Sequence, residues 1–122
     1  MTDAQQPWGP AAFEAGLRAV GYQPRQITTA QNVEFTVFDY VVEVGPQAGE
    51  NVQIGLQVPP DFTVTPPPGP HVSPPLNHPG GNVHPSPLGP DWRYWSRPMP
   101  DWAADRSVDA YLRHVRTLFS QL

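Results

Sequence analysis

The chain has 122 residues, which leaves room for a single domain, because domains most often contain about 100 to 150 residues. It carries seven Arg, no Lys and eleven acidic residues, and its formal charge is -4. Phosphate binding needs clustered cations, whereas these arginines are spread along the chain, so we expect no nucleic-acid partner. Cysteine is absent, which excludes disulfides, thiolate metal sites and a cysteine nucleophile.

No apolar stretch approaches the roughly 20 residues that are needed to cross a bilayer. Residues 1–10 have neither the basic flank nor the apolar run of a secretory signal. We therefore expect a cytoplasmic protein with no membrane partner, folded as one domain over residues 1–122, with a flexible tail over residues 1–9.

Apolar residues recur at helical spacing near the N-terminus, at Phe13, Leu17 and Val20. Pro10 suits the first turn of a helix and Gly21 suits its end. The pattern predicts a short amphipathic helix between these two residues.

Two alternating runs follow, over residues 33–44 and 52–58, separated by turn-forming residues 45–49. The second run alternates strictly, which is typical of a strand with one face in the core. The first run changes parity near Phe38, which indicates either a bulge or a strand that is buried on both faces. Together the runs predict an antiparallel hairpin.

The segment 59–100 contains 14 of the 18 prolines, and each proline removes a backbone donor. We therefore expect a long ordered loop there with no helix and no central strand, and only residues 62–65 able to add an edge strand. Aromatic burial would repay the entropy of ordering this loop; the aromatic residues concerned are Trp92, Tyr94, Trp95 and Trp102.

A second helix is predicted from Ser107 to Phe119, because apolar residues recur there at offsets of three and four. Either Asp105 or Ser107 can cap its first free amides. The predicted fold class is α+β: an antiparallel β-meander sheet packed by an N-terminal and a C-terminal helix, with a long proline-rich loop.

Three short motifs stand between these elements: Gly21-Tyr22 after the first helix, Pro59-Pro60 after a strand, and Trp92-Arg93-Tyr94-Trp95-Ser96-Arg97 before the last helix. This order resembles the ubiquitin-conjugating-enzyme fold, and more narrowly the prokaryotic conjugating-enzyme-like family E. In that family the third motif reads W-x-x-W-S-R-H. The resemblance spans nearly the whole chain, and its most specific part is the tryptophan motif.

Two departures from the family pattern bear on activity. Pro98 stands where the family has His, so the role of that His is not carried over. His78-Pro79-Gly80 resembles the His-Pro-Asn of conjugating enzymes, whose Asn side chain steadies an oxyanion, and Gly80 has no side chain to donate. The nucleophilic Cys of those enzymes corresponds to a position near Leu88, with Ser86 and Gly89 beside it.

The loop also contains His71, His78 and His84, which with Asp91 would offer four ligands to zinc if the loop brought them together. Their spacing matches no recognised metal motif, so we expect no metal and no cofactor. His78 is instead interpreted as a structural residue that bonds to backbone.

Nucleophilic catalysis would use Ser86 or Ser96 as nucleophile, His84 or His78 as base, and Asp91 as orienter. Neither serine lies in a G-x-S-x-G elbow. The hydroxyl of Ser96 is better interpreted as bonding locally to backbone.

The tryptophans have two interpretations, as anchors of the loop or as part of a recognition surface, and exposure distinguishes the two. What the resemblance implies is a cysteine-less binding component of a prokaryotic ubiquitin-like conjugation pathway, whose partners are a ubiquitin-like protein, an activating enzyme, or both. The residues predicted to bind are His78, Pro79, Leu88, Trp92, Tyr94, Trp95, Ser96 and Arg97.

Three alternatives remain open at this stage. The chain can be an active transferase of that pathway that uses Ser86 or a histidine, a small metal-dependent or Ser/His hydrolase, or an interaction domain unrelated to ubiquitin-like proteins. The missing thiol argues against enzyme activity. The absence of Lys has two explanations, biased composition or the avoidance of self-modification.

Overall fold

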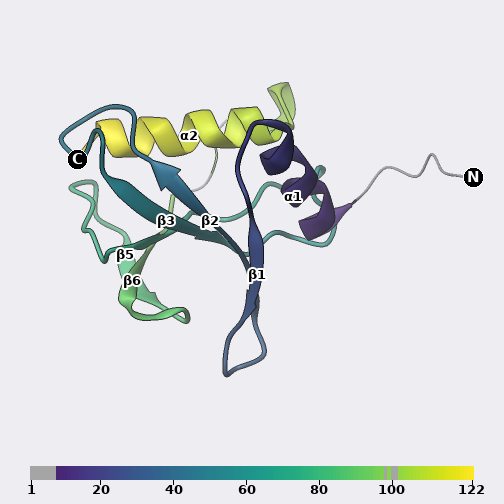
Figure 1. The fold of residues 1–122 in the computed structure, drawn as a ribbon, viewed down its shortest axis with the longest axis horizontal. Helices are drawn as coiled ribbons and strands as arrows, with labels where there is room; N and C mark the ends of the chain where they lie inside the picture. Colours follow the sequence, from purple (N-terminus) through teal and green to yellow (C-terminus); the bar gives the residue numbers. More distant parts are fainter. Residues whose placement is uncertain (1–7, 98, 100–101) are drawn as a thin grey trace, which may run out of the picture.

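The computed structural model describes residues 8–97, 99 and 102–122. In these residues two helices accompany a six-stranded sheet in which all neighbouring strands are antiparallel, in the order β1-β2-β3-β4-β6-β5 (Figure 1). The elements are α1 (Gly9–Ala19), β1 (Arg25–Thr28), β2 (Glu34–Val41), β3 (Asn51–Leu56), β4 (His71–Ser73), β5 (Val83–Ser86), β6 (Gly89–Trp95), the short 3-10 helix η1 (Trp102–Ala104) and α2 (Val108–Ser120). The coarse α+β prediction is confirmed.

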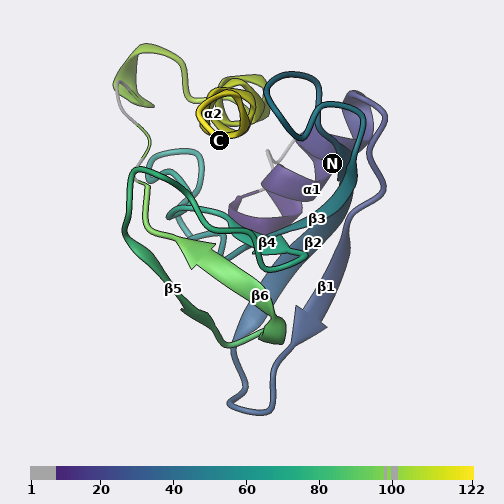
Figure 2. The ribbon, with the colours of Figure 1, turned by 90° about the vertical axis from the view of Figure 1, so that its left-hand side faces the viewer.

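Both helices lie on the same face of the sheet, and the main core fills the space between these two layers (Figures 1 and 2). This core includes Phe13 and Leu17 of α1 and Tyr111, Val115 and Phe119 of α2, all fully buried. The opposite, open face of the sheet carries a smaller apolar cluster of Phe35, Val37 and Trp92. The fold is therefore two layers with a second, minor core on its open face.

Strand β2 is buried on both faces along part of its length, which explains the change of parity seen in the sequence. Phe35 and Val37 belong to the open-face cluster, whereas Phe38 and Tyr40 belong to the main core. The pairing of β2 with β3 runs without a register shift from Thr36↔Leu56 to Val41↔Asn51. The predicted hairpin is confirmed, and the parity change does not come from a bulge.

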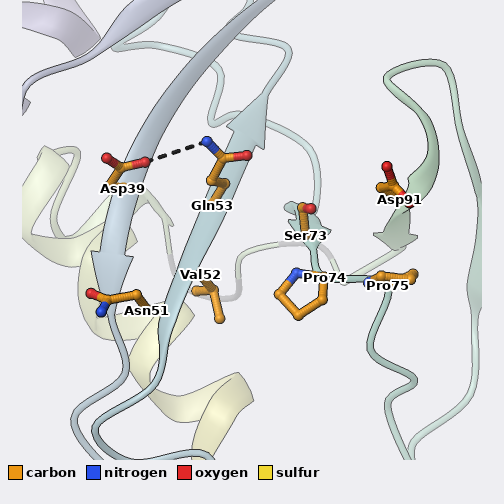
Figure 3. Close-up of a pocket in the computed structure, with 8 residues that line it drawn as sticks. All are labelled: Asp39, Asn51, Val52, Gln53, Ser73, Pro74, Pro75 and Asp91. Carbon is orange, nitrogen blue, oxygen red and sulfur yellow. Dashed lines mark hydrogen bonds between the residues drawn. The ribbon is translucent and has the colours of Figure 1, made fainter.

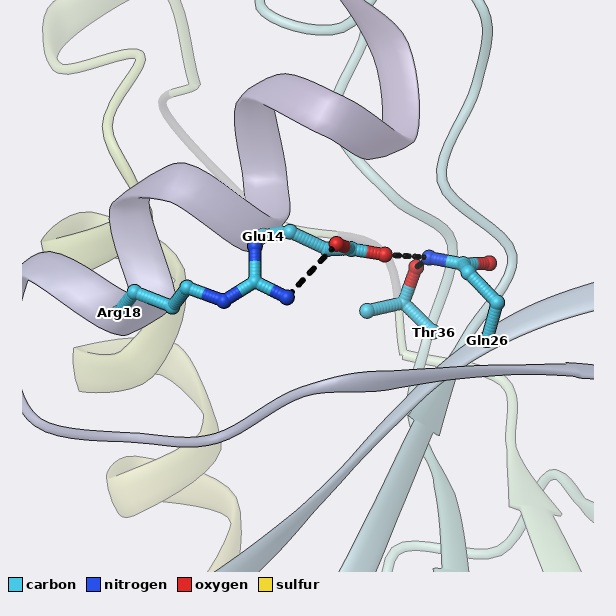
Figure 4. Close-up of polar contacts among 4 residues, drawn as sticks. All are labelled: Glu14, Arg18, Gln26 and Thr36. Atoms are coloured by element: carbon cyan, nitrogen blue, oxygen red, sulfur yellow. Dashed lines mark hydrogen bonds and ion pairs between the residues drawn. The ribbon is translucent and has the colours of Figure 1, made fainter.

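Strand β1 was not predicted, because its four residues are mostly exposed and show no alternation. Its partner is the first half of β2. Gln26 of β1 donates to the Thr36 hydroxyl at 2.7 Å and also to the Glu14 carboxylate of α1, which in turn pairs with Arg18 at 3.2 Å (Figure 4). One amide side chain thus ties α1 to two strands.

The prediction that residues 59–100 form a long loop without a central strand is wrong, because β4, β5 and β6 all lie within this segment and β4 and β6 are internal strands. The prolines are placed where no ladder donor is needed: Pro70 and Pro74 flank β4, and Pro85 lies in the edge strand β5. The predicted edge strand over residues 62–65 is instead a series of turns.

The prolines before β4 are fixed to the rest of the molecule by three contacts. The Tyr111 hydroxyl of α2 donates to the Pro68 carbonyl at 2.7 Å, and the Trp95 amide donates to the Pro70 carbonyl at 2.9 Å. Between them, Gly69 packs so closely that a methyl group there would overlap the Trp95 carbonyl oxygen. This segment is therefore an ordered part of the core wall.

The two helices are close to their predicted ranges. Ser107 caps α2, because its hydroxyl accepts from the Ala110 amide at 3.0 Å, whereas Asp105 pairs with Arg113 at 2.8 Å. Helix α1 begins at Gly9, inside the predicted tail over residues 1–9. Residues 1–7 of that tail lie outside the described residues.

The close packing of Gly69 predicts that Gly69→Ala lowers the free energy of unfolding by roughly 3 kcal/mol, since the added methyl must displace backbone atoms of β6. Gly21→Ala is the control: Gly21 has a φ of +98° and no neighbour within 4 Å, so its variant carries only conformational strain of about 1 kcal/mol. Urea unfolding measures both. Equal losses in the two variants would contradict the packing argument.

Candidate functional site

The two sequence motifs that were predicted to form a recognition surface meet at one corner of the sheet. Arg97, which follows β6, donates through its Nη2 to the Gly81 carbonyl at 2.7 Å and lies 3.2 Å from His78 Nδ1. The Ser96 amide donates to the Asn82 carbonyl at 2.9 Å. The turn at residues 78–82 is therefore held by the end of the tryptophan motif, although about 15 to 20 residues separate them in the chain.

His78 is a structural residue, as its interpretation from the sequence proposed. Its Nδ1 accepts from the Gly80 amide at 3.1 Å, so the ring proton is on Nε2, which donates to the Leu118 carbonyl of α2 at 3.1 Å. Burial lowers the pKa of His78, the Leu118 carbonyl opposes this, and the Arg97 charge lowers the pKa further. The neutral imidazole thereby joins the turn to α2.

Gly80 is needed by this arrangement. A side chain at this position would overlap the Arg97 guanidinium and would approach His78 Nδ1. The space beside Gly80 is thus occupied by a cation from another segment. That cation is bound to backbone and imidazole acceptors.

The tryptophans of the motif are buried. Trp95 is fully buried in the main core, where its Nε1 donates to the Leu76 carbonyl at 2.9 Å, and Trp92 lies in the open-face cluster. Trp102 is also buried and donates to the Thr63 carbonyl at 2.9 Å. This burial agrees with the interpretation of the tryptophans as anchors of the loop. Because they are buried, Trp92 and Trp95 offer little surface to a partner.

The remaining predicted binding residues differ in exposure. Pro79 is exposed, whereas Leu88, Tyr94, Ser96 and Arg97 are half-buried. Leu88 and Tyr94 lie on the open face, beside Trp92 and His71, whereas residues 79–82 are exposed and contact Ser96 and Arg97. We call residues 78–82 together with 96–97 the turn surface.

The Ser86 hydroxyl contacts His71, whereas the sequence analysis considered His84 or His78 as its base. Ser86 Oγ lies 2.7 Å from His71 Nδ1 and accepts from the Leu88 amide at 3.1 Å. His84, a predicted base, is exposed, and its ring lies 6.1 Å from that of Tyr94. The register of β4, β5 and β6, rather than closeness in sequence, decides this pairing.

His71 is enclosed on the open face of the sheet. It is 2% exposed, stacks on Tyr94 at 4.5 Å between ring centroids and meets the Phe35 ring at 4.8 Å. Burial lowers its pKa to about 4, and within the described residues its Nε2 has no hydrogen-bond partner. A triad needs a third group to orient the base, and no such group bonds this ring.

The three loop histidines do not come together. His71 lies on the open face, His78 packs against Trp95 and α2 beneath the other face, and His84 is on the edge strand. Among residues 8–97, 99 and 102–122, no group of three potential metal ligands is close enough to hold an ion. Asp91, the expected fourth ligand, lies in a separate groove.

That groove has a volume of about 490 Å³ and is lined by residues of β2, β3 and the chain around β4 (Figure 3). Its lining is mixed: Gln53 donates to Asp39 at 3.4 Å and Ser73 and Asp91 stand on its other side, while Val52, Pro74 and Pro75 add apolar surface. The sequence analysis included Asp91 but missed the rest. Asp39, a charge inside an apolar run, was the signal for this polar end of the sheet.

Comparisons with protein-family models, curated proteins and solved structures gave no match. The likeness to conjugating enzymes therefore depends on the motifs quoted above. Within the described part of the chain, neither helix has the length and hydropathy that a bilayer span requires.

Buried neutral histidines predict a loss of stability in acid. In the folded state the pKa of His71 is about 4, against 6.5 when unfolded, so the unfolded chain binds the proton more readily. The free energy of unfolding should fall as the pH drops from about 6.5 towards 4, by about 3 kcal/mol from His71 alone. Burial also lowers the pKa of His78 and His114, which act in the same direction.

Urea unfolding at several pH values between 4 and 7 measures this dependence. His71→Gln should flatten the profile, because an amide still reaches Ser86 but does not titrate. The control is His84→Gln, at an exposed position of the edge strand β5, which should reproduce the parent profile. An unchanged slope in His71→Gln would exclude His71 as the source.

Proposed function

We propose that this protein is a cysteine-less, conjugating-enzyme-like binding component of a prokaryotic ubiquitin-like conjugation pathway, and that its turn surface docks the ubiquitin-like protein or the activating enzyme. The observation that carries this proposal is the contact between the two motifs, in which Arg97 is bonded to Gly81 and lies beside His78. The end of the tryptophan motif and the His78 turn, two segments on which the resemblance rests, are thus in contact.

The order of this surface favours binding. A partner that meets a segment already held in place loses less conformational entropy on docking, and affinity rises accordingly. Here the turn is fastened to β6 through Arg97 and to α2 through His78. Its exposed side, which begins at Pro79, remains available.

The absence of a thiol also favours a protein that binds the ubiquitin-like protein over one that carries it as a thioester. No thiol exists in the chain, and a serine hydroxyl is essentially un-ionised at neutral pH without a suitable base. The chain also has no Lys, so it offers no ε-amine for modification by the pathway in which it would act.

A charge introduced on the turn surface tests the proposal. Candidate ubiquitin-like proteins and activating enzymes, sought among the neighbouring genes, are purified, and their binding is measured by calorimetry. The parent should bind one of them, and Pro79→Glu should weaken that binding about tenfold or more, because it places an unpaired charge in the interface.

Pro46→Glu is the matched control, since Pro46 is also an exposed turn proline but lies between β2 and β3. It should bind as the parent does. Absence of binding by the parent protein, or equal loss in both variants, would contradict the proposal.

A second candidate function rests on one contact, the 2.7 Å separation of Ser86 Oγ and His71 Nδ1. A serine beside an imidazole is the arrangement from which an active transferase or a hydrolase would work. Incubation with activating enzyme, ATP and the ubiquitin-like protein distinguishes this candidate. It predicts a thiol-resistant covalent adduct that Ser86→Ala abolishes, whereas our proposal predicts a complex that denaturant separates completely.

A further inference from the structure

The two edges of the sheet, β1 and β5, differ in whether they can pair with a further strand (Figure 2). Just before β5, the Asn82 carbonyl accepts from the Ser96 amide, so the alternation of an antiparallel ladder turns Pro85 outward. Pro85 has no N–H to donate, which blocks pairing at that edge. Strand β1 contains no proline and only one charged residue, Arg25, so its edge has no such block.

The backbone groups of Gln26 and Thr28 point away from the sheet. Just beyond β1, the Thr29 amide donates to the Val33 carbonyl at 2.8 Å, so these two residues form a hydrogen-bonded pair. Bonded pairs alternate along an antiparallel ladder, so the backbone of Ile27 faces β2, whereas that of residues 26 and 28 faces outward. Among the described residues, no other backbone group bonds to these outward donors and acceptors.

The apolar cluster of the open face extends to this edge. Ile27 and Val33 pack against its buried members, and both side chains remain half-buried rather than fully covered. Ile27 is the middle residue of the segment 26–28, which carries no charge. A strand added beside β1 would therefore cover an apolar side chain without bringing a charge of this segment into the contact.

We propose that β1 pairs with β1 of a second copy of this chain, antiparallel and about a two-fold axis at Ile27. Gln26 of each copy then lies opposite Thr28 of the other, and each such pair exchanges N–H···O=C bonds through its outward groups. Ile27 lies beside its counterpart on the open face, which joins the two apolar clusters. Arg25 lies opposite Thr29, so like charges do not face each other.

The short edge sets the strength of this pairing. An interface built on a strand of four residues buries less than about 1,200 Å² in total, which is the size of weak and transient complexes. We therefore expect a dissociation constant of about 0.1 to 1 mM. Residues 78–82 lead into β5 at the opposite edge, so the turn surface stays exposed in both copies. The pairing does not depend on the function proposed for that surface.

Amide hydrogen exchange of the ¹⁵N-labelled full chain, followed by NMR at about 0.05 mM and about 1 mM, tests the pairing. The amides of Gln26 and Thr28 should exchange about twofold or more slowly at the higher concentration, because only the second copy bonds them. The Ile27 amide faces β2 in either state and is the internal reference. Rapid exchange of the two amides at both concentrations would overturn the proposal. Equal protection at both would also overturn it, because a segment of the same chain would then cover the edge.

Sedimentation equilibrium of variants locates the contact. Ile27→Lys places like charges side by side at the axis, and Thr28→Pro removes an N–H that faces away from β2, so each should raise the dissociation constant about tenfold or more. Circular dichroism checks the fold, and Thr28→Pro decides alone if Ile27→Lys does not fold.

Val41→Lys is the matched control, because Val41 is 52% exposed at the end of β2 that lies beyond β1. It should associate as the parent does. A parent that is monomeric at about 1 mM, unchanged association in the folded β1 variants, or an equal loss in Val41→Lys would each contradict the pairing.

Discussion

The burial of Trp95 is the interaction on which the second half of the structure depends. Its ring fills the space between the sheet and α2, 5.1 Å from Phe119, and its backbone amide and indole both donate to carbonyls of the proline-rich segment. Ordering a residue costs about 1 to 2 kcal/mol, and prolines contribute no backbone donor to offset that cost. Trp95 brings a large ring with its indole donor, and a backbone donor, into this region, so that one residue supplies both apolar burial and hydrogen bonds. Two residues later, Arg97 lies beside the His78 turn.

Periodicity in the sequence predicted the elements that are long enough to show it. Both helices and the β2–β3 hairpin repeat an apolar pattern several times, and their observed bounds lie within a few residues of the predicted ones. Strands β1 and β4 have four and three residues, which is too few for alternation to be recognised. Counting prolines over a long segment also concealed the short proline-free stretches in which β4 and the second half of β6 form.

The candidate site was predictable as a set of segments but not as a set of contacts. The sequence indicated that the His78 turn and the tryptophan motif act together, and it could not indicate that Arg97 fills the space left by Gly80. Ser86 and His71 illustrate the same limit, since strands β4 and β5 both pair with β6 and only that register brings the two side chains within 2.7 Å. Polar contacts between strands depend on register, which a short irregular strand does not reveal in its sequence.

The pKa of His71 and the hydrogen bonds of Ser86 argue against a catalytic role for the contact between them. An effective general base has a pKa near the working pH, whereas burial lowers the pKa of His71 to about 4, and no group orients its other nitrogen among the described residues. The same hydroxyl already accepts the Leu88 amide, so it serves to close the turn between β5 and β6. Ser86 itself is half-buried, but the His71 ring that would have to act as its base is only 2% exposed. The arrangement that stabilises the open face therefore works against its use as an active site.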